Sequence, residues 1–408
     1  MSELSYLEKL LDGVEVEWLP LGEVSALRRG RVMSKGYLTE NFGPYPVYSS
    51  QTANNGKIGS INTFDFDGEY ISWTTDGANA GTVFYRTGKF SITNVCGLIT
   101  LKSKCPLIYK FLFYWLTIEA KKHVYSGMGN PKLMSYQVEN IPVPIPCPDN
   151  PEKSLAIQSE IVRILDKFTA LTAELTAELT AELNMRKKQY NYYRDQLLSF
   201  KEGEVEWKTL GEIGKWYGGG TPSKNKIEFW ENGSIPWISP KDMGRTLVDS
   251  SEDYITEEAV LQSSTKLIPA NSIAIVVRSS ILDKVLPSAL IKVPATLNQD
   301  MKAVIPHENI LVKYIYHMIG SRGSDILRAA KKTGGSVASI DSKKLFSFKI
   351  PVPNINEQQR IVEILDKFDT LTNSITEGLP REIELRQKQY EYYRDLLFSF
   401  PKPETVSN

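Results

Sequence analysis

The chain has 408 residues, with 48 basic and 48 acidic side chains that cancel to a formal net charge of zero. This length is too great for one ordinary core and suits two domains of about 150 residues with a connection between them. The balanced charge excludes a strong long-range attraction to nucleic acid, so any DNA binding must use local basic patches.

The cysteines and the N-terminus indicate where such a protein works. Cys96, Cys105 and Cys147 have no paired spacing and lie apart from the three histidines, which argues against zinc and favours a reducing compartment. The N-terminus lacks a basic stretch followed by an apolar core, and no run approaches 18 apolar residues. We therefore expect a soluble cytoplasmic protein without a membrane contact.

The chain contains an internal repeat, carried by its matching ends. The matched blocks are Glu15–Glu23 with Glu204–Glu212 at an offset of 189, and Ile164–Phe168 with Ile364–Phe368 and Gln189–Asp195 with Gln389–Asp395 at an offset of 200. Between these ends, roughly 25–140 and 214–349, the two halves share almost nothing. Two different variable segments between matching ends suit a protein that recognises one binding partner at two places, and DNA is the natural candidate.

In chain order we expect a mixed α/β domain over residues 1–150, a central helix over 151–200, a second mixed domain over 201–353, and a distal helix with a tail over 354–408. The pattern of apolar residues and turn signals predicts short strands and helices inside the domains. The strands are expected at Val47–Tyr48, Tyr70–Trp73, Ile273–Val277 and Leu345–Ile350, and the helices at Leu107–Leu116 and Leu311–Ile319.

The central helix is predicted from a segment, about 152–200, that contains no proline or glycine. Apolar residues alternate steps of four and three, which is typical of a coiled-coil seam; they are Ile157, Ile161, Ile164, Phe168, Leu171 and Leu175. A helix of this length spans roughly 70 Å, so we expect it to act as a spacer.

The distal segment repeats this seam and makes the two helices obvious partners. Its seam residues are Ile361, Ile364, Phe368, Leu371 and Ile375. Pro380 is expected to kink or restart the distal helix, because proline cannot continue the hydrogen-bond ladder.

The central helix also carries three tandem Thr-Ala-Glu-Leu tetrads, whose repeat positions are Thr172, Leu175, Thr176, Leu179, Thr180 and Leu183. Each tetrad advances a helix by about 6 Å and about 40°, which is comparable to the DNA twist of about 34–36° per base pair. Adding or removing one tetrad would change the reach and the rotation between whatever lies at the helix ends. A replication-slippage relic in a tolerant helix is the alternative explanation.

No catalytic constellation is recognised in the sequence. Gly218–Lys224 lacks the spacing of a phosphate-binding loop, and neither a methyl-transfer box nor an acidic nuclease motif is found. We therefore expect a chain that is not itself an enzyme.

Basic residues cluster at like positions in both variable segments, mixed with side chains that can contact phosphate or base edges. The candidate DNA-binding residues are Arg28, Arg29, Arg31, Lys35, Lys121, Lys122 and Lys132 in the first domain, and Lys215, Lys224, Lys226, Lys241, Arg245, Arg322, Arg328, Lys331 and Lys332 in the second. The alternative for each residue is an ordinary solvated charged face.

The blocks near the far ends of the two helices predict a docking surface for a protein partner at two equivalent sites. The residues are Arg186, Lys188, Tyr190, Tyr193, Arg386, Lys388, Tyr390 and Tyr393. A surface that lines DNA and simple packing at the helix ends are the alternatives.

These features together resemble the specificity subunit of a type I restriction-modification system over nearly the whole chain. The resemblance rests on the duplicated frame, the proline-rich strand before each long helix, the repeated blocks and the tetrads, which are typical of the type IC subgroup. The segment Gly219–Ser223 with Ile235–Ile238 also resembles the opening of a recognition domain in that family.

The resemblance implies an α+β protein with two mixed α/β target recognition domains, joined by two long antiparallel coiled-coil helices with pseudo-two-fold symmetry. Each domain would read one half of a bipartite asymmetric site in double-stranded DNA, and the helices would set the spacer. Two methyltransferase subunits and two restriction motor-nuclease subunits would be the partners. The chain would hold no cofactor or metal, whereas S-adenosylmethionine, ATP and Mg would bind to the partners.

Two other classes of protein remain open from the sequence. A self-contained DNA-modifying enzyme with degenerate motifs would bind S-adenosylmethionine or a divalent metal by itself. A coiled-coil scaffold without a DNA role would tolerate exchange of its variable segments without any change in sequence preference.

Overall fold

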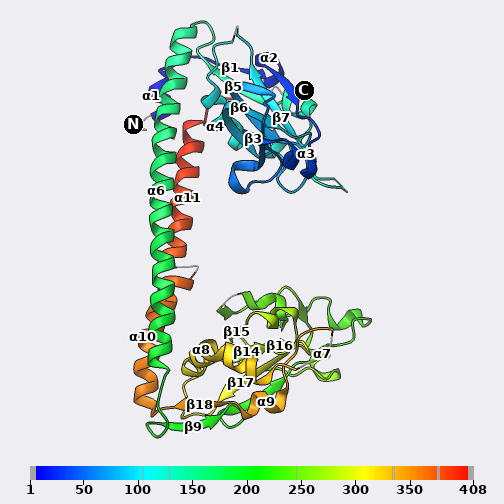
Figure 1. Ribbon diagram of the computed structural model, residues 1–408, viewed down its shortest axis with the longest axis vertical. Helices are drawn as coiled ribbons and strands as arrows, with labels where there is room; N and C mark the ends of the chain where they lie inside the picture. The colour runs from blue at the N-terminus through cyan, green and yellow to red at the C-terminus, as the bar shows by residue number, and fades with distance from the viewer. Residues whose placement is uncertain are drawn as a thin grey trace. The chain divides into compact units, whose positions relative to one another are not determined.

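A computed structural model describes residues 6–402, except 104, 128, 245, 333, 335, 375 and 376. The chain divides into two compact units (Figure 1). Unit 1 comprises residues 1–176 and 385–408, and unit 2 comprises residues 177–384. Each unit therefore combines one variable segment with parts of both long helical segments.

Unit 1 contains a mixed α/β domain followed by the first part of the longest helix. Its elements are α1 (Tyr6–Leu11), β1 (Val16–Pro20), α2 (Leu21–Val24), β2 (Ser25–Arg29), α3 (Lys35–Glu40), β3 (Phe42–Tyr48), η1 (Ala53–Gly56), β4 (Lys57–Ile61), β5 (Phe66–Thr74), β6 (Val83–Ile92), β7 (Cys96–Leu101), α4 (Tyr109–Glu119), η2 (Ala120–His123), α5 (Ser135–Glu139) and β8 (Pro142–Pro146). Helix α6 (Pro151–Leu197) follows and continues into unit 2.

Unit 2 contains the second α/β domain and most of the distal helical segment. Its elements are β9 (Glu206–Thr209), β10 (Gly214–Gly218), η3 (Ile227–Phe229), β11 (Ile235–Ile238), η4 (Pro240–Gly244), β12 (Leu247–Val248), β13 (Tyr254–Ile255), α7 (Glu257–Gln262), β14 (Ser272–Val276), η5 (Ser280–Asp283), β15 (Ser288–Ile291), β16 (Thr296–Leu297), β17 (Met301–Pro306), α8 (Val312–Ala330), α9 (Ser342–Ser347), β18 (Lys349–Val352) and α10 (Ile355–Asn373). Helix α11 (Gly378–Leu397) begins in unit 2 and ends in unit 1.

The two domains share one frame of strands. The main sheet of unit 1 has the order β2-β7-β5-β6-β3-β4, and that of unit 2 has the order β10-β17-β14-β15-β12. The first four strands correspond in order, and every neighbouring pair among them is antiparallel. A two-stranded ribbon, β1-β8 or β18-β9, accompanies each sheet. The repeat seen at the ends of the sequence therefore also exists inside the domains, where the residues differ.

The domains differ mainly in the segment that follows the first frame strand. In unit 1 this segment forms the antiparallel hairpin of β3 and β4, and β3 pairs in parallel with β6. In unit 2 it forms η3, α7 and strands β11, β12 and β13, and β11 pairs in parallel with β16, which comes from the later connection between β15 and β17. A common frame with unlike insertions explains why the middles of the two halves share almost nothing in sequence.

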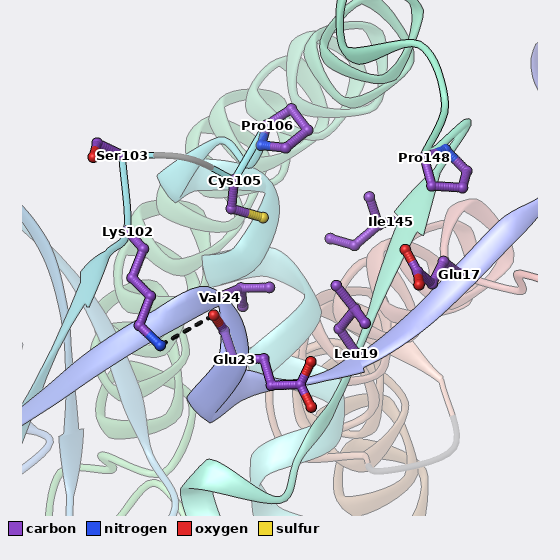
Figure 2. Close-up of a pocket in the computed structure, with 10 residues that line it drawn as sticks. All are labelled: Glu17, Leu19, Glu23, Val24, Lys102, Ser103, Cys105, Pro106, Ile145 and Pro148. Carbon is purple, nitrogen blue, oxygen red and sulfur yellow. Dashed lines mark hydrogen bonds between the residues drawn. The ribbon is translucent and has the colours of Figure 1, made fainter.

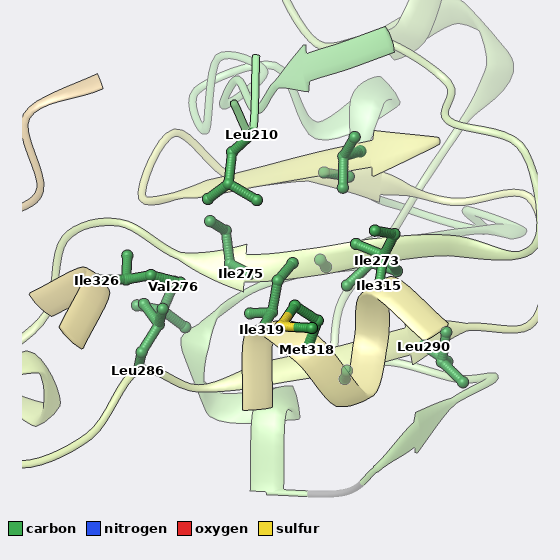
Figure 3. Close-up of a cluster of buried hydrophobic side chains, with 14 of the residues drawn as sticks. Leu210, Ile273, Ile275, Val276, Leu286, Leu290, Ile315, Met318, Ile319 and Ile326 are labelled. Carbon is green, nitrogen blue, oxygen red and sulfur yellow. The ribbon is translucent and has the colours of Figure 1, made fainter. Parts of the chain in front are cut away.

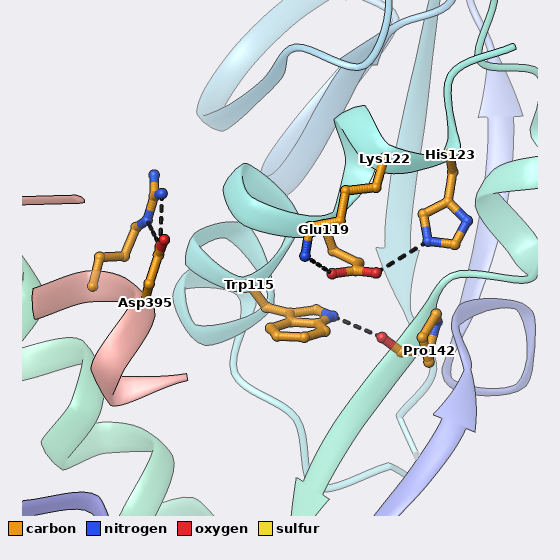
Figure 4. Close-up of polar contacts among 7 residues, drawn as sticks. Trp115, Glu119, Lys122, His123, Pro142 and Asp395 are labelled. Carbon is orange, nitrogen blue, oxygen red and sulfur yellow. Dashed lines mark hydrogen bonds and ion pairs between the residues drawn. The ribbon is translucent and has the colours of Figure 1, made fainter. Parts of the chain in front are cut away.

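The core of each domain lies between its sheet and one helix. In unit 2, strand β14 is buried along its whole length, and Ile315, Met318 and Ile319 of α8 lie over it (Figure 3). In unit 1, Phe111 and Trp115 of α4 pack against Phe398 just beyond α11. Trp115 also donates a hydrogen bond of 2.7 Å from Nε1 to the carbonyl of Pro142, which joins α4 to β8 (Figure 4).

The long helices begin at sequence signals that fit helix N-termini. Asn150 accepts a hydrogen bond from the backbone N–H of Lys153 at 3.0 Å, and Pro151 occupies the first position of α6. Asn354 caps α10 in the same way, accepting from Glu357 at 3.1 Å. Asparagine caps and a first-turn proline both favour a helix start, so these boundaries follow from the sequence.

The first turns of both helices are part of the domain cores. Ile157, Ile161 and Leu165 of α6 are buried in the core of unit 1, and Ile361 and Leu365 of α10 are buried in that of unit 2. The first positions of the predicted seam thus attach each helix to its own domain.

A buried glutamine fixes each of these attachments by hydrogen bonds. Gln158 accepts from the N–H of Ile108 at 2.9 Å and donates to the carbonyl of Pro106 at 2.8 Å. Gln358 accepts from the N–H of Leu311 and donates to the carbonyl of Pro353, both at 2.8 Å. In both units the amide satisfies the backbone N–H just before α4 or α8, where a helix start leaves donors unpaired.

Within each unit the two helical segments also contact one another through stacked aromatic rings. Phe168 of α6 stacks on Tyr393 of α11 in unit 1, with ring centroids 5.4 Å apart. Tyr193 of α6 stacks on Phe368 of α10 in unit 2, with centroids 5.7 Å apart. Rings offset at this separation add stabilisation beyond the apolar area that they bury.

The α+β fold class and the long helices are confirmed, with two local corrections. The strand predicted at Leu345–Ile350 is partly wrong, because α9 occupies Ser342–Ser347 and β18 begins only at Lys349. Asp341 caps α9 by accepting from the N–H of Lys344 at 3.0 Å, and this signal was missed.

The distal segment is two helices rather than one. Helix α10 ends at Asn373, and α11 begins at Gly378, whose φ of +80° suits glycine, with Pro380 in its first turn. The restart expected at Pro380 is confirmed, whereas the seam residue Ile375 lies outside the described residues. None of the helices in the described part of the chain is long and apolar enough to cross a membrane.

The attachment of α6 to unit 1 predicts the effect of a truncation. Leu165→Ala should lower the free energy of unfolding by about 2–5 kcal/mol, because the side chain is 0 % exposed and its removal leaves a cavity. Leu171→Ala on the same helix, where the side chain is 52 % exposed, should change it by less than about 1 kcal/mol. Urea unfolding followed by circular dichroism measures both; equal losses for the two variants would contradict the attachment.

Candidate nucleic-acid interface

Loops that are far apart in the sequence meet at one place in unit 1. The unit 1 loop cluster comprises residues 28–31, 49–57, 75–80, 93–95 and 129–133. Thr75 donates its N–H to Val95 O at 3.0 Å, and Leu133 donates to Thr75 O at 2.9 Å. These backbone bonds tie three of the loops together at the ends of β5 and β7.

The other two loops join the cluster through side chains. Asn79 donates from Nδ2 to the carbonyl of Ser50 at 3.0 Å, and Thr93 donates its hydroxyl to that of Ser49 at 2.8 Å. Arg29 donates to the carbonyl of Asn94 at 2.9 Å. Five hydrogen bonds therefore hold the unit 1 loop cluster together, and Thr75, Thr93 and Leu133 within it are buried.

Four predicted DNA-binding residues belong to this cluster, namely Arg28, Arg29, Arg31 and Lys132. Arg29 also lies 3.9 Å from Asp76, and Lys132 forms a backbone bridge with that same residue. Arg31 pairs with Asp65 at 3.0 Å and remains exposed. The structure thus brings Arg29, Arg31 and Lys132 together from segments about 100 residues apart in the chain.

The corresponding connections of the shared frame meet in unit 2. The unit 2 loop cluster comprises residues 218–221, 277–283, 297–301 and 336–340. Val277 donates its N–H to Asp300 O at 2.8 Å, Ser279 donates to Ala338 O at 3.0 Å, and Gly220 donates to Leu297 O at 2.8 Å. Thr221 donates its hydroxyl to Gln299. The equivalent loops of the two domains form equivalent clusters from different residues.

A basic hollow lies beside the unit 2 loop cluster. Its volume is about 600 Å³, and its charged lining consists of Asp283, Lys284, Arg328, Lys331 and Lys332. Asp283 pairs with Lys331 at 2.7 Å, which leaves an excess of positive charge around the hollow. Three of the four cations were predicted as DNA contacts, and a phosphate group is the anion that such a lining suits.

Other predicted DNA-binding residues lie outside the clusters or are already engaged. Lys122 pairs with buried Glu119 at 2.8 Å and neighbours His123 on the same carboxylate (Figure 4). Burial alone would raise the pKa of Glu119, but hydrogen bonds from Lys122 and His123 outweigh it and lower the pKa. Lys122 is therefore held by a carboxylate inside unit 1.

The remaining candidates are exposed to different degrees. Lys35, Lys121, Lys215 and Lys224 are exposed, as is Arg28 of the unit 1 loop cluster. Lys226 lies over the ring of Phe229, Lys241 lies 3.7 Å from Glu252, and Arg322 lies 3.6 Å from Asp325. Arg245 lies outside the described residues.

The structure adds residues that sequence reasoning missed. Arg278 pairs with Asp300 inside the unit 2 loop cluster at 2.5 Å, and Lys284 lines the basic hollow. Both are single basic residues among apolar or small neighbours, so no clustering in the sequence marked them.

Each long helix presents an aspartate at an equivalent position to the helix that covers the sheet of its unit. Asp166 accepts from Lys110 Nζ at 2.6 Å and from the hydroxyl of Tyr114 at 2.8 Å in unit 1. Asp366 accepts from Lys313 and lies 3.3 Å from His317 Nε2 in unit 2. The aspartate of each repeated Ile-Leu-Asp-Lys-Phe block thus anchors a helix to its own domain.

The predicted docking tyrosines divide into the half-buried Tyr190 and Tyr390 and the more exposed Tyr193 and Tyr393. Burial raises the pKa of Tyr190 to about 12, and its hydroxyl lies 3.1 Å from His317 Nδ1. Thr169 donates to the hydroxyl of Tyr390 at 3.2 Å. Tyr193 and Tyr393 stack on phenylalanines of the same unit yet remain partly exposed.

Their neighbours Tyr192 and Tyr392 are 62 % and 64 % exposed, and the sequence analysis did not select them. Arg186 pairs with Glu182 at 3.2 Å, Arg386 donates to Gln389 at 3.1 Å, and Lys188 and Lys388 are exposed. All six tetrad positions lie on α6, where Thr172, Leu175, Thr176, Leu179 and Leu183 are partly exposed and Thr180 is exposed.

A second hollow in unit 1 has a volume of about 570 Å³ and lies apart from the predicted residues (Figure 2). Lys102 spans its edge by donating to the carbonyls of Gly22 and Glu23 at 2.7 and 3.1 Å. Burial raises the pKa of Cys105 in its wall, which favours the less reactive neutral thiol. Within the described ranges, His, Cys, Asp and Glu side chains form no group of three or more that could hold a metal ion.

Comparison with known families identifies the type of protein. A family model described as the type I restriction modification DNA specificity domain matches residues 13–185 and 202–385. The chain belongs to this family. One match falls on each half of the internal repeat, as the resemblance implied.

Curated relatives extend over the whole chain. The type I restriction enzyme EcoR124I/EcoR124II specificity subunit of Escherichia coli is 71 % identical, with 100 % of both chains covered. The type I restriction enzyme EcoprrI specificity subunit of Escherichia coli is 38 % identical over 92 % of this chain and 93 % of that protein.

A solved structure from work on complex assembly and conformational transition of the type I R-M system has a TM-score of 0.59 at 16 % identity, covering 94 % of this chain and 98 % of that one. At this identity the likeness shows the fold, which is that of two α/β domains with long helices.

The charged network of unit 2 predicts a pH-dependent stability. Burial raises the pKa of Asp366, but hydrogen bonds from His317 and Lys313 outweigh it, so the folded pKa lies below its ordinary value. The ionised form therefore stabilises unit 2 at neutral pH, and this contribution is lost as the pH falls from about 3.9 through the lower folded value.

Asp366→Asn should accordingly destabilise the chain at pH 7, and the difference should be smaller at pH 3, below the ordinary pKa of about 3.9. Urea titrations at both values measure it, with the exposed Glu231→Gln of unit 2 as a control expected within about 0.5 kcal/mol of the parent. A pH-independent difference would contradict the role of the ionised Asp366.

Proposed function

We propose that this chain selects the DNA sequence at which a type I restriction-modification complex acts. The unit 1 loop cluster reads one half of a bipartite asymmetric site, and the unit 2 loop cluster reads the other. The observation that carries this proposal is that equivalent loops of one shared frame form equivalent polar clusters from unlike residues. A reader of two different half-sites needs a constant frame with two variable surfaces.

The chemistry of both clusters suits duplex DNA. Arg29, Arg31 and Lys132 of the unit 1 loop cluster supply cations for phosphates, as do Lys331 and Lys332 of the basic hollow beside the unit 2 loop cluster. Amide and hydroxyl side chains among the same loops supply donors and acceptors for base edges. Because the formal net charge is zero, this attraction is local and falls off within about 10 Å at ordinary salt.

The chain is proposed to act without a catalytic group or cofactor of its own, in the cytoplasm. Two methyltransferase subunits dock on the repeated helical blocks, where exposed Tyr192 and Tyr392 add apolar area next to Tyr193 and Tyr393. Two motor-nuclease subunits complete the restriction complex. S-adenosylmethionine, ATP and Mg bind to these partners, which methylate adenine and cleave DNA.

The tetrads of α6 are proposed to fix the unspecified gap between the half-sites. Each tetrad contributes about 6 Å of rise and about 40° of rotation to a continuous helix. A change of four residues therefore preserves both reading surfaces and changes the distance and the angle at which DNA must present them.

Deleting residues 180–183 should leave both half-site sequences unchanged and shorten the gap between them. The measurement is a genome-wide map of methylated adenines after expression with the methyltransferase subunit in a strain without modification. Replacing the same four residues by Lys-Ala-Glu-Leu keeps the helix length and should keep the original gap. Methylation at the original gap by the deletion variant would contradict the ruler role.

Exchanging residues 25–140 for the same segment of another family member should change one half-site only. The second half-site and the gap should stay, because unit 2 and α6 are untouched. The same methylation map reads out the result. Simultaneous loss of both half-sites from a complex that still assembles would show that the domains do not read independently.

A further inference from the structure

The hairpin loop between β3 and β4 has an unusual backbone. Asn54 and Asn55 have φ of +50° and +53°, and Gly56 follows at +80°, so three successive residues occupy the left-handed region. Asparagine tolerates this region better than most residues, but each such residue still costs free energy relative to an ordinary conformation. Something in the surroundings must hold the loop in place.

Arg86 of β6 is the group that holds it. Its side chain is 3 % exposed, and the guanidinium lies 3.6 Å from the ring centroid of Tyr48 and 4.5 Å from that of Phe84. Nη1 donates to the carbonyl of Asn55 at 2.8 Å, and Nε donates to the hydroxyl of Ser72 at 3.0 Å. One planar cation thus joins the loop to two strands beneath it.

The loop also packs closely on Arg86 at Gly56, where an added side chain would crowd the guanidinium. A Cβ on Gly56 would lie 3.0 Å from Nη2 of Arg86 and 3.3 Å from the carbonyl of Gln51. Gln51 itself donates to the carbonyl of Lys57 at 2.5 Å, which closes the base of the loop. The backbone of residues 54–56 is therefore fixed by Arg86 and by the hydrogen bond that closes the base of the hairpin loop.

Burying the charge of an arginine costs free energy, so Arg86 is not explained by the stability of the domain. Among the described residues no carboxylate pairs with Arg86, and burial lowers the pKa of its guanidinium to about 10. Replacing a buried charge by an apolar side chain of similar size is often neutral or stabilising. Stability alone therefore gives little reason for an arginine at this position.

The loop that Arg86 supports lies in the unit 1 loop cluster and exposes amides. Asn54 and Asn55 are both exposed, and within the described part of the chain their side-chain amides have no hydrogen-bond partner. Asn79 and Thr93 tie the start of the loop to the neighbouring connections. An asparagine amide can donate to and accept from the N7 and N6 positions of adenine as a bidentate pair.

We propose that the amides of Asn54 and Asn55 read bases in the half-site of unit 1, and that Arg86 is the positioning residue that fixes the loop for this contact. The inference rests on the proposed reading of one half-site by unit 1. Strand β15 of unit 2, which corresponds to β6, has the sequence Ser-Ala-Leu-Ile and carries no basic residue. Strand β15 therefore has no counterpart of Arg86.

The test is the methylation map of the full complex for variants of these residues. Asn54→Gly and Asn55→Gly keep a backbone suited to positive φ and remove only the amide. At least one should relax the preference at one base position of the unit 1 half-site by roughly 5- to 150-fold, the range of a bidentate contact. The other half-site and the gap should be unchanged.

Arg86→Met keeps the length and apolar packing of the side chain and removes the hydrogen bond to Asn55. It should relax the same base position while the unfolding midpoint in urea stays near that of the parent. Lys89→Met, which removes an exposed charge from the same strand, should leave the motif intact. If Arg86→Met does not fold, the two glycine variants decide the proposal by themselves.

The outcomes separate this inference from the proposed function. A parent complex that gives no bipartite motif would overturn the proposed function itself. A bipartite motif that stays unchanged in both glycine variants would overturn the reading role of the loop. A relaxed motif in the glycine variants with an unchanged motif in a folded Arg86→Met variant would overturn the positioning role of Arg86.

Discussion

The attachment of each long helix to the core of its own domain is the constraint on which the rest of this protein depends. The first turns of α6 and α10 contribute Ile157, Ile161 and Ile361 to apolar cores rather than to a surface. Gln158 and Gln358 add buried hydrogen bonds that leave little freedom for a helix to rotate on its domain. When a helix is fixed to its domain in this way, a change in the length of the helix or in its rotation about its own axis also moves the loops of that domain.

The shared frame then allows the reading surfaces to vary without loss of that attachment. Four strands, one covering helix and one ribbon recur in both units, and the loop clusters lie at equivalent connections. Insertions after the first frame strand differ in both length and topology. The residues that stabilise the frame are mostly apolar, while those that form the clusters are mostly polar, so substitutions in one set need not disturb the other.

Much of this organisation could be predicted from the sequence, because it depends on local patterns. The absence of proline and glycine marks α6, and Pro380 marks the start of α11. The loop clusters could not be predicted, since their hydrogen bonds join segments such as Thr75 and Leu133 that no periodicity connects. Arg86 and Arg278 were missed for the same reason, because a single basic residue in a strand or loop gives no signal until its partners are placed.

The measurement that tests the central claim most directly is the map of methylated adenines that this chain produces with its methyltransferase partner in cells without other modification. The account predicts two short specified sequences separated by a gap of fixed length. One continuous motif would contradict it, as would the absence of any sequence preference from a complex that assembles and methylates.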